Sequence, residues 1–542
     1  MNEASQRADW ARGWRAWLLA AAFYLPMAVV VLAHLLLPPA GEWPTGFLQY
    51  DQQSYMAMAR EPFDALAEGR GFSPAFGLPT SPDPETPRHY FAPHLLLLGV
   101  VQWLGDFDPG RLYLAFGAVA GLVFLRLAIA LYGRVVRDRD GAALLGLACF
   151  LWGGGLFVAA GLVASASPGR LDYNSLFQFD PYGGFWLLNL GRNLFYAVES
   201  YYHAVALALL LALFDRRWLP AMLLLVLLAA SHPFTGLQFL LITLAWTLLE
   251  WLLRPAADRP PLWFALSALA LAALFLAYHF LLLPQSAEHR ALMQQWSLSW
   301  ILPLEAIALG YALVLPPAVL QCLAGGLRDR RRQLLLTIAG VSFLLANHEL
   351  FISPRQPLHF TRGYDWMALF LLGAPLLVGL LRSWLAGWRR LLAAAVAGLF
   401  LLDNAAWLAV QAVQNAGGFG AARRLTAAER QTLARLDDPT YAGHLLVSAD
   451  ERLGYDAIAY TSLRSWYSQE HSTPWSPERL AELRAWATTG REPAAWHTRP
   501  VVFLLQDSGQ DLAALPWITA TSELERVEAG GQAYWLVLRP PP

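Results

Sequence analysis

A series of long apolar runs constrains this chain more than any other feature. The sequence has 542 residues, of which 56% are hydrophobic and 15% are charged. A helix that crosses a bilayer needs about 20 predominantly apolar residues, and about eleven runs approach this requirement. They cover residues 16–37, 110–133, 141–164, 195–214, 218–232, 236–253, 262–283, 301–323, 333–347, 365–381 and 391–413. The sequence therefore predicts an α-helical polytopic membrane protein, and not a large soluble enzyme.

Arginines gather in every second gap between these runs and predict the orientation of the chain. The clusters lie at residues 7–15, 134–139, 216–217, 254–259, 328–332 and 382–390. Positive residues are retained on the cytoplasmic side, so we expect a cytoplasmic N-terminus and an outer C-terminal tail. Every basic residue is arginine and none is lysine, which we interpret as the codon bias of a GC-rich bacterial genome. The predicted location is therefore the bacterial inner (cytoplasmic) membrane, with a periplasmic C-terminal domain.

Two regions are not predicted to cross the membrane. The run at 93–104 is apolar but only about a dozen residues long, which suits an interfacial or re-entrant helix better than a crossing. From about residue 417 the composition is that of a soluble domain, with a helix at 421–436, a strand at 444–448, a helix at 477–487, a strand at 500–506 and a hairpin at 524–538. We therefore predict a transmembrane catalytic domain at 1–416, with its first outer loop at 38–92, and a small extracytoplasmic α/β domain at 417–542.

The predicted outer loops carry the acids, histidines and aromatic residues, whereas the predicted inner loops are short and basic. Ionisable groups are costly near a membrane, so several loops that bring them to one face predict a shared aqueous cavity there. Each residue could instead have a structural role, and Glu199 and His203, one helical turn apart, could pair with each other. The predicted cavity-lining residues are Tyr55, Asp172, Asp180, Glu199, His203, His232, His348 and Glu349.

Asp51 stands where the chain leaves the first apolar run and is the candidate catalytic residue. The helix expected at 52–69 has Tyr55, Met58, Phe63 and Leu66 at helical spacing, which predicts a helix lying on the membrane surface. A carboxylate here could accept a proton from an attacking hydroxyl, orient that hydroxyl or bind a metal. The alternative is that Asp51 simply caps the helix that follows it, because Asp is a favoured N-cap residue.

Two further outer segments predict contact with an anionic group. Residues 87–94 include His89 and His94, which could contact a lipid head group or belong to an interfacial aromatic and cationic belt. The loop at 348–366 holds Arg355, His359 and Arg362. Arginine can hold phosphate through two parallel hydrogen bonds, and the positive-inside rule does not favour arginines in an outer loop. We therefore predict phosphate binding by this loop.

Short motifs in these segments resemble the GT-C superfamily of polytopic glycosyltransferases, which use polyprenyl-phosphate-linked sugars. The motifs are Tyr50-Asp51 followed by Ser54-Tyr55 and by residues 57–60, the return segment at 89–95, and residues 110–112. The layout is similar to that of the protein mannosyltransferases and the aminoarabinose transferase, and the tail segments at 459–464 and 471–474 are like those of some bacterial members. The layout covers nearly the whole chain.

The resemblance implies that Asp51 activates an acceptor for inverting attack on the anomeric carbon. The implied partners are the membrane, a polyprenyl-phosphate-linked sugar donor, and a lipid, glycan or protein acceptor; no nucleic acid is expected. The resemblance makes six residues candidates for binding the donor phosphate: Arg60, His89, His94, Arg355, His359 and Arg362.

One departure from the family pattern leaves the cofactor open. Many relatives carry a second acid directly after the first, whereas position 52 is Gln. The site is therefore either metal-independent or holds a divalent cation with an acid from another loop, for which Asp172 and Asp180 are candidates.

Two other classes of function compete with glycosyl transfer. A polytopic transporter or lipid-linked-sugar flippase without transferase activity would also have many spans, but transporters tend to contain internal repeats, which we do not find in this sequence. An assembly protein whose tail binds a partner would not need Asp51.

Overall fold

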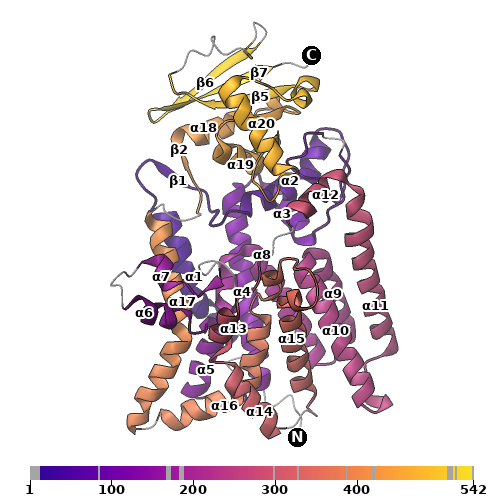
Figure 1. Ribbon diagram of the computed structural model, residues 1–542, viewed down its shortest axis with the longest axis vertical. Helices are drawn as coiled ribbons and strands as arrows, with labels where there is room; N and C mark the ends of the chain where they lie inside the picture. Colours follow the sequence, from indigo (N-terminus) through magenta and orange to yellow (C-terminus); the bar gives the residue numbers. More distant parts are fainter. Residues whose placement is uncertain are drawn as a thin grey trace. The chain divides into compact units, whose positions relative to one another are not determined.

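The computed structural model describes residues 13–83, 86–166, 172–181, 188–296, 300–325, 329–385, 387–417, 422–509, 517–518 and 522–539. Arg7, Arg12 and Arg328, three of the arginines used to predict orientation, lie outside these residues. The described chain is mostly helical (Figure 1). It divides into two compact units, which we call the helical unit (residues 1–31, 117–276 and 298–414) and the mixed unit (residues 32–116, 277–297 and 415–542).

Seven helices in the described residues are long and apolar enough to cross a membrane. The last turns of α11 continue through the π-helix η6 (Tyr278–Leu282), so that this candidate span reaches Gln285. The seven are α1 (Gly13–Leu36), α4 (Pro109–Val135), α8 (Ala197–Phe214), α10 (Pro233–Leu253), α11 (Leu262–Ala277), α16 (Tyr364–Trp384) and α17 (Arg390–Gly417).

Two further candidate spans are broken in the middle. Helices α5 (Gly141–Trp152) and α6 (Phe157–Ser165) meet at a bend of 74°, and α13 (Leu304–Tyr311) and α14 (Leu315–Gly325) meet at 64°. The first break falls on three consecutive glycines, 153–155, which are poor helix formers. Asp403 then caps α6, because its carboxylate accepts from the backbone N–H groups of Phe157 at 3.2 Å and Val158 at 2.8 Å.

The predicted count of eleven spans is not confirmed. The described residues give seven candidates, or nine if each bent pair is one span. The difference lies in α9 (Trp218–Ser231), which has 14 residues, and α15 (Arg330–Ala346), which has 17. Pro233 follows the end of α9 and disfavours its continuation, and α15 begins with Arg330, Arg331 and Arg332, so its apolar part is shorter than the helix.

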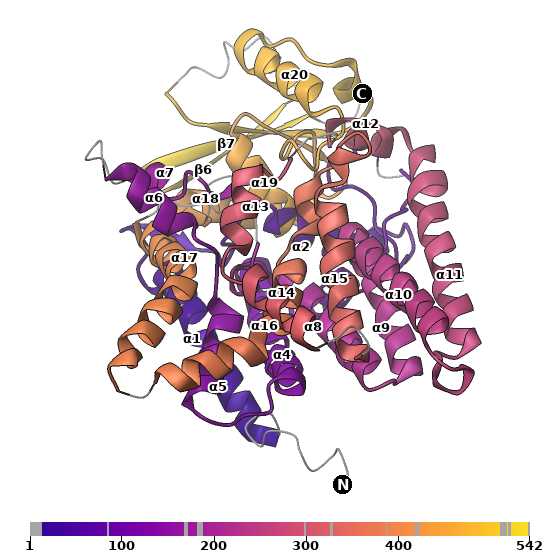
Figure 2. The same ribbon diagram turned by 60° about the horizontal axis from the view of Figure 1, so that its bottom comes forward.

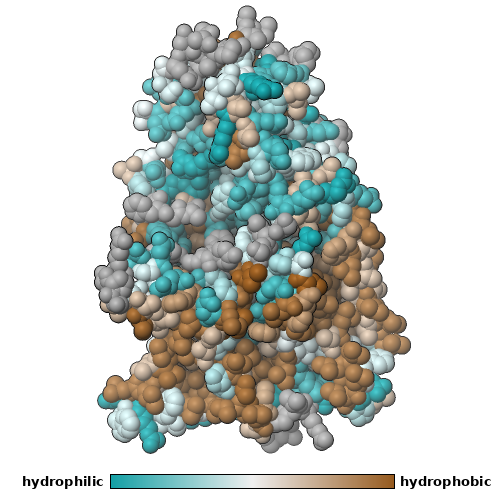
Figure 3. All heavy atoms as spheres, in the orientation of Figure 1, coloured by the Kyte–Doolittle hydropathy of each residue, from teal (hydrophilic) through white to brown (hydrophobic). Residues whose placement is uncertain are grey.

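The packing and surface of the helical unit agree with the class of multi-pass membrane proteins. Helices α14, α15 and α16 lie side by side (Figure 2). The surface over α11 is predominantly hydrophobic (Figure 3), and Leu262, Leu266, Leu269 and Leu274 are exposed there. Exposed leucines in such numbers on one helix are expected when lipid, not water, is the neighbour.

The mixed unit joins the first predicted outer loop to the C-terminal residues. Strand β1 (Glu42–Pro44) pairs antiparallel with β2 (Arg424–Thr426), and Trp43 lies opposite Leu425. Helix α2 (Gln52–Ala67) packs against both α3 (Pro93–Gly105) and α19 (Glu451–Tyr460). The short helix predicted at 93–104 is confirmed as α3. The polar residues Gln52, Gln53 and Ser54 in the first turn of α2 are buried, and the position of α2 on a membrane surface stays a prediction.

The C-terminal residues form a five-stranded mixed sheet. Its strand order is β4-β3-β5-β7-β6, in which β3 is parallel to β4 and β5, and β7 is antiparallel to β5 and β6. The predicted hairpin is confirmed, with Gly530 and Gly531 at positive φ in its turn. The strands are β3 (Leu445–Ser448), β4 (Arg464–Ser465), β5 (Val501–Gln506), β6 (Glu523–Ala529) and β7 (Gln532–Arg539).

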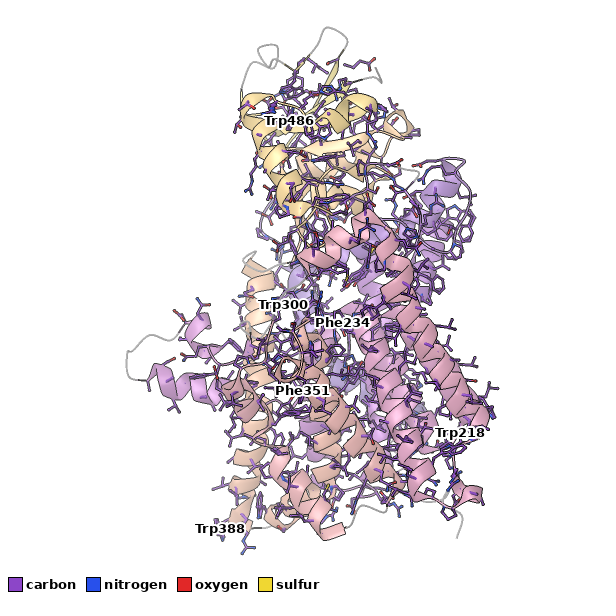
Figure 4. All side chains as sticks on the ribbon, turned by 45° about the vertical axis from the view of Figure 1, so that its right-hand side comes forward. Trp218, Phe234, Trp300, Phe351, Trp388 and Trp486 are labelled. Atoms are coloured by element: carbon purple, nitrogen blue, oxygen red, sulfur yellow. The ribbon has the colours of Figure 1, made fainter. Side chains whose placement is uncertain are left out.

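Alternating side chains of the strands fill a hydrophobic core on each face of this sheet. Leu446, Val502 and Leu504 pack with α18 (Ala427–Leu436) and α19. Val447 and Phe503 pack with Trp486 of α20 (Ser476–Thr489), which Figure 4 labels. The period of two matches the strand geometry. The remaining helices are α7 (Tyr173–Leu176) and α12 (Ala287–Gln295), with short 3₁₀ helices η4 (Gly191–Phe195), η5 (Ala256–Asp258), η7 (Leu283–Gln285), η8 (His348–Leu350), η9 (Pro357–Phe360), η10 (Gly387–Arg389), η11 (Pro439–Tyr441) and η12 (Ala494–Thr498).

Candidate functional site

Asp51 occupies the N-cap position of α2, but its carboxylate does not cap the helix. No hydrogen bond joins its side chain to a backbone N–H of the first turn. Oδ1 instead accepts a hydrogen bond from the side-chain amide of Gln469, at 3.3 Å. The alternative role considered from the sequence, a capping carboxylate, is therefore not the one observed.

A cluster of neutral polar side chains surrounds this carboxylate within the mixed unit. Ser54 Oγ lies 3.2 Å from the hydroxyl of Tyr455 and 3.3 Å from Oγ of Ser472. The amide of Gln469 also lies 3.2 Å from both Ser54 Oγ and the Tyr455 hydroxyl. Tyr455 donates to the carbonyl oxygen of Tyr50. Every member is a hydroxyl or an amide, and Gln469 links the hydroxyls to the Asp51 carboxylate.

Burial governs the acidity of Asp51. It raises the pKa of the half-buried carboxyl above its usual range, while the Gln469 hydrogen bond and the interaction with His471 act in the opposite direction. A carboxylate with a raised pKa is a stronger base once it is ionised, and general bases work best when their pKa lies closer to the working pH. The raised pKa is compatible with a general base, and Asp64, Asp437 and Asp456 share this direction of shift.

A buried ion pair fixes the element that carries Tyr455. Asp456, the next residue of α19, pairs with Arg423 and accepts from the side-chain amide of Gln53 at 3.2 Å. Asp450 caps α19 by accepting from the N–H groups of Arg452 and Leu453, both at 3.0 Å. These contacts set the position of Tyr455 against the first turn of α2.

Tyr455, Gln469 and Ser472 were not predicted from the sequence as site residues. Gln469 and Ser472 belong to the polar run at 468–473 of the C-terminal region, and that run is the signal that could have indicated them. Its proximity to Asp51 follows from the packing of α19 against α2, which no local pattern predicts.

The other predicted site residues of the mixed unit have structural contacts. Tyr55 stacks on Tyr113, with ring centroids 6.3 Å apart. Arg60 lies 3.6 Å from the Asp64 carboxylate and 3.7 Å from that of Asp437, and donates to the carbonyl of Ala459.

The two histidines predicted to meet the donor phosphate differ in burial. His94 is 2% exposed, and burial lowers its pKa to about 3, so it is neutral at pH 7 and cannot supply positive charge to a phosphate. His89 is half-buried, and its backbone carbonyl accepts from the hydroxyl of Tyr278 at 2.7 Å.

In the helical unit, the structure brings together four predicted residues: Glu199, His203, His359 and Arg362. The Arg362 guanidinium forms an ion pair with Glu199, and both side chains are less than a tenth exposed, at 7% and 6%. Arg362 also lies 2.6 Å from Nδ1 of His359, and its backbone carbonyl lies 2.8 Å from Nε2 of His203. Glu199 and His203 were expected to pair. His203 Nδ1 contacts the backbone carbonyl of Glu199 at 2.8 Å, whereas the Glu199 carboxylate pairs with Arg362.

Aromatic rings enclose His359 of this cluster. Phe234 stacks on the imidazole with centroids 4.3 Å apart, and Trp300 lies at 5.6 Å. Figure 4 shows Phe234 and Trp300 close to each other in this part of the unit. His359 and Arg362 are therefore held in a fixed arrangement in which the charge of Arg362 is already balanced by Glu199.

Arg355 differs from Arg362 in the same loop. His348 accepts from the backbone N–H of Arg355 at 2.8 Å, which fixes the backbone there. The Arg355 side chain is exposed, and within the described part of the chain its guanidinium forms no ion pair. Glu349, which follows His348 in the sequence, is half-buried. Arg355 is thus the arginine of this loop that can meet an external anion without breaking an internal pair.

The remaining candidates of the helical unit act as caps or in a buried pair. His232 accepts from the N–H of Thr235 at 3.1 Å and so caps α10. Asp172 accepts from the N–H of Ser175 at 2.8 Å. Asp180 lies 2.6 Å from Arg192, and both side chains are buried.

The described residues offer no ligand set for the divalent cation that the sequence left open. They contain no group of three or more His, Cys, Asp or Glu side chains arranged to hold a metal. Asp51 accepts a hydrogen bond from the Gln469 amide and interacts with His471, and Asp172 and Asp180 are engaged elsewhere. We therefore derive no step through a metal.

Comparison with known proteins adds no family. No family model matches the chain, and no curated protein is detectably similar to it in sequence. The GT-C resemblance of the short motifs stays a prediction.

Proposed function

We propose that this chain is a GT-C-type membrane glycosyltransferase, which moves a sugar from a polyprenyl-phosphate donor to an acceptor hydroxyl, with Asp51 as the catalytic carboxylate. The observation that carries the proposal is that Asp51 stands at a helix N-cap without capping it, and has a raised pKa within a neutral polar cluster. The apolar helices support a membrane-bound, lipid-linked substrate.

The proposed reaction is a single displacement. The acceptor oxygen attacks the anomeric carbon, and its proton passes to the Asp51 carboxylate. The bond between the anomeric carbon and the phosphate oxygen breaks, and polyprenyl phosphate leaves with the electron pair. This direct attack inverts the configuration at the anomeric carbon. A positioned general base contributes roughly 10²–10⁴-fold to such a step.

The donor phosphate needs a positive partner in this scheme. We propose Arg355 for this role in preference to Arg362, because Arg362 is paired with Glu199 and its removal from that pair would leave a buried carboxylate without its partner. An exposed guanidinium can bind a phosphate through two parallel hydrogen bonds.

The test uses membranes that contain the Asp51→Asn variant and a panel of radiolabelled polyprenyl-phosphate sugars. We expect transfer to fall by at least about a hundredfold, because Asn keeps the shape of Asp but cannot accept the proton. Asp83→Asn, an exposed acid of the same predicted loop, is the matched control and should transfer normally. Undiminished transfer by folded Asp51→Asn would show that the catalytic assignment is wrong.

The same assay separates transfer from lipid flipping. A transferase releases polyprenyl phosphate, whereas a flippase leaves the bond between the sugar and the phosphate intact. Translocation of intact donor without release of polyprenyl phosphate would favour the flippase.

We also propose that the chain lies in a bacterial inner membrane with a cytoplasmic N-terminus and an outer C-terminal region. The alternation of arginine-rich gaps supports this orientation. Alkaline phosphatase fused after residue 542 should be active, because this reporter folds only outside the cytoplasm. An inactive but intact fusion would contradict the orientation.

A further inference from the structure

A pocket in the mixed unit lies apart from the Asp51 cluster. Its volume is about 470 Å³, within the usual range for small-molecule sites. Its walls come from α2, α3, the turn that follows α3, and α18. Asp51 does not line it. The α2 residues that do, from Arg60 onward, lie two or more helical turns beyond Asp51, roughly 13 Å along the helix.

Aromatic rings in fixed orientations form the apolar part of the pocket wall. Trp103 is 60% exposed and is stacked on buried Phe63, with ring centroids 5.7 Å apart. The guanidinium groups of Arg111 and Arg430 lie over the Trp43 ring, 4.8 Å and 4.4 Å from its centroid, so the open aromatic face is that of Trp103. A flat aromatic face with a negative quadrupole attracts the weakly positive C–H groups of a sugar ring. Such faces suit a ligand that is both flat and polyhydroxylated.

The charged groups of the pocket disfavour an anion. Four carboxylates line it, those of Asp64, Asp106, Asp108 and Asp437, against the two arginines Arg60 and Arg430. Arg60 is already shared between Asp64 and Asp437. The carboxylates can accept hydrogen bonds from hydroxyl or ammonium groups, so the ligand is expected to be neutral or cationic.

Two polar atoms in the wall lack a protein partner. Oε1 of Gln102 and the hydroxyl of Tyr460 are buried and make no hydrogen bond within the described residues. Buried polar groups are almost always hydrogen-bonded, so orphaned atoms on residues that line a cavity are consistent with a site for a polar ligand. Neither atom is open to solvent, so each side chain would rotate to form a hydrogen bond with a ligand hydroxyl.

We propose that this pocket binds a neutral or amino-substituted sugar unit, such as one residue of a glycan. Fixed aromatic faces, carboxylate acceptors and two orphaned polar atoms converge on that chemistry. A lipid tail would leave the carboxylates and the orphaned atoms unsatisfied, and an anionic sugar would meet the excess of carboxylates. The proposal concerns binding and does not rest on the transfer reaction.

The experiment is saturation-transfer NMR on the purified full-length protein in lipid nanodiscs, since many common detergents carry sugar head groups. The probes are methyl α-glucoside, methyl α-mannoside, methyl α-galactoside, glucosamine and glucuronate. We expect a saturation-transfer signal on the protons of at least one neutral sugar or of glucosamine, and no such signal on glucuronate. Trp103→Ala should weaken the apparent affinity by about tenfold, the loss expected for one aromatic stacking contact.

A second variant guards against misfolding. Gln102→Met keeps nearly the same length and removes an amide whose Oε1 makes no hydrogen bond within the described residues, so it should fold normally and still weaken binding. Trp388→Ala, which removes an exposed tryptophan of the helical unit, is the control and should bind as the unmodified protein does. The proposal is overturned if no neutral or amino sugar is saturated, if glucuronate binds best, or if both pocket variants retain full affinity.

Discussion

The side-chain amide of Gln469 donates to Oδ1 of Asp51 at 3.3 Å, across 418 positions of the sequence. A residue of the C-terminal region therefore contacts the candidate catalytic carboxylate of the first predicted outer loop. Both belong to one compact unit, in which Ala57 of α2 packs against Tyr455 and Ile458 of α19. The C-terminal region is thus part of the structure that holds Asp51.

Replacing Gln469 by Ala should change the pH dependence of transfer. The Gln469 hydrogen bond lowers the pKa of Asp51, so its loss raises that pKa further. Because the ionised carboxylate is the proposed base, the acid limb of the rate profile should move to higher pH. Initial rates measured between pH 5 and 9 test this. Gln506→Ala, at an exposed position of β5, is the control; an unchanged limb in Gln469→Ala would show that this hydrogen bond does not act on the base.

The two arginines of the loop at 348–366 should differ when each is replaced by Ala. Arg362→Ala leaves Glu199 buried without its ion-pair partner, which typically costs about 3–5 kcal/mol of the free energy of unfolding. Arg355→Ala removes an exposed side chain, so its stability should change by less than about 0.5 kcal/mol while donor affinity falls. Thermal unfolding and donor titration separate the two effects.

The pairing explanation has its own control. In the double variant Arg362→Ala with Glu199→Ala, the unfolding cost should be smaller than the sum of the two single costs, because neither charge is left alone. Strictly additive costs would contradict the ion pair. Equal donor affinity in Arg355→Ala and the unmodified protein would contradict the phosphate role of Arg355.

Much of the fold could be predicted from local patterns. Apolar runs located every candidate span, because length and hydropathy are local properties. The hairpin at the C-terminus was predictable from alternation and from its paired glycines. The count of spans was not, since α9 with 14 residues and α15 with 17 are shorter than a bilayer-crossing helix needs, and two other runs are broken by bends.

The candidate site was less predictable than the fold. Asp51 could be chosen from its position at the end of an apolar run, but its partners Gln469, Tyr455 and Ser472 come from far along the chain and depend on tertiary packing. Arg362 shows that residue type alone does not reveal an internal partner. Its residue type and loop predicted phosphate binding, while the buried carboxylate of Glu199, brought close by a different helix, already satisfies its charge.

Gly99 of α3 should not tolerate a side chain. A Cβ built there would overlap the carbonyl oxygen of Ala59 and the ring of Phe63, because α2 and α3 approach closely at this point. Gly99→Ala should therefore destabilise the protein by about 1–3 kcal/mol, the usual cost of overpacking. Gly340→Ala in α15, where a Cβ meets nothing within 4 Å, is the matched control and should be neutral or stabilising. A similar unfolding midpoint for both variants would contradict the close approach.

Asp64 should make stability decrease as the pH rises. Burial raises its pKa from 3.8 to about 6, with Arg60 opposing the shift. The folded state therefore binds the Asp64 proton more tightly than the unfolded state. This tighter binding adds its full contribution to the free energy of unfolding below about pH 4, and the contribution is lost as the pH rises from about 4 to 6. Over that window the loss is at most about 3 kcal/mol.

Asp64→Asn cannot ionise, so its unfolding midpoint should exceed that of the unmodified protein at pH 8 and match it more closely at pH 4. Asp507→Asn is the control. Hydrogen bonds from Gly509 and Arg526 lower the pKa of the Asp507 carboxyl, so this variant should not raise the unfolding midpoint at pH 8. Parallel pH dependences for Asp64→Asn and the unmodified protein would show that Asp64 does not titrate in this window.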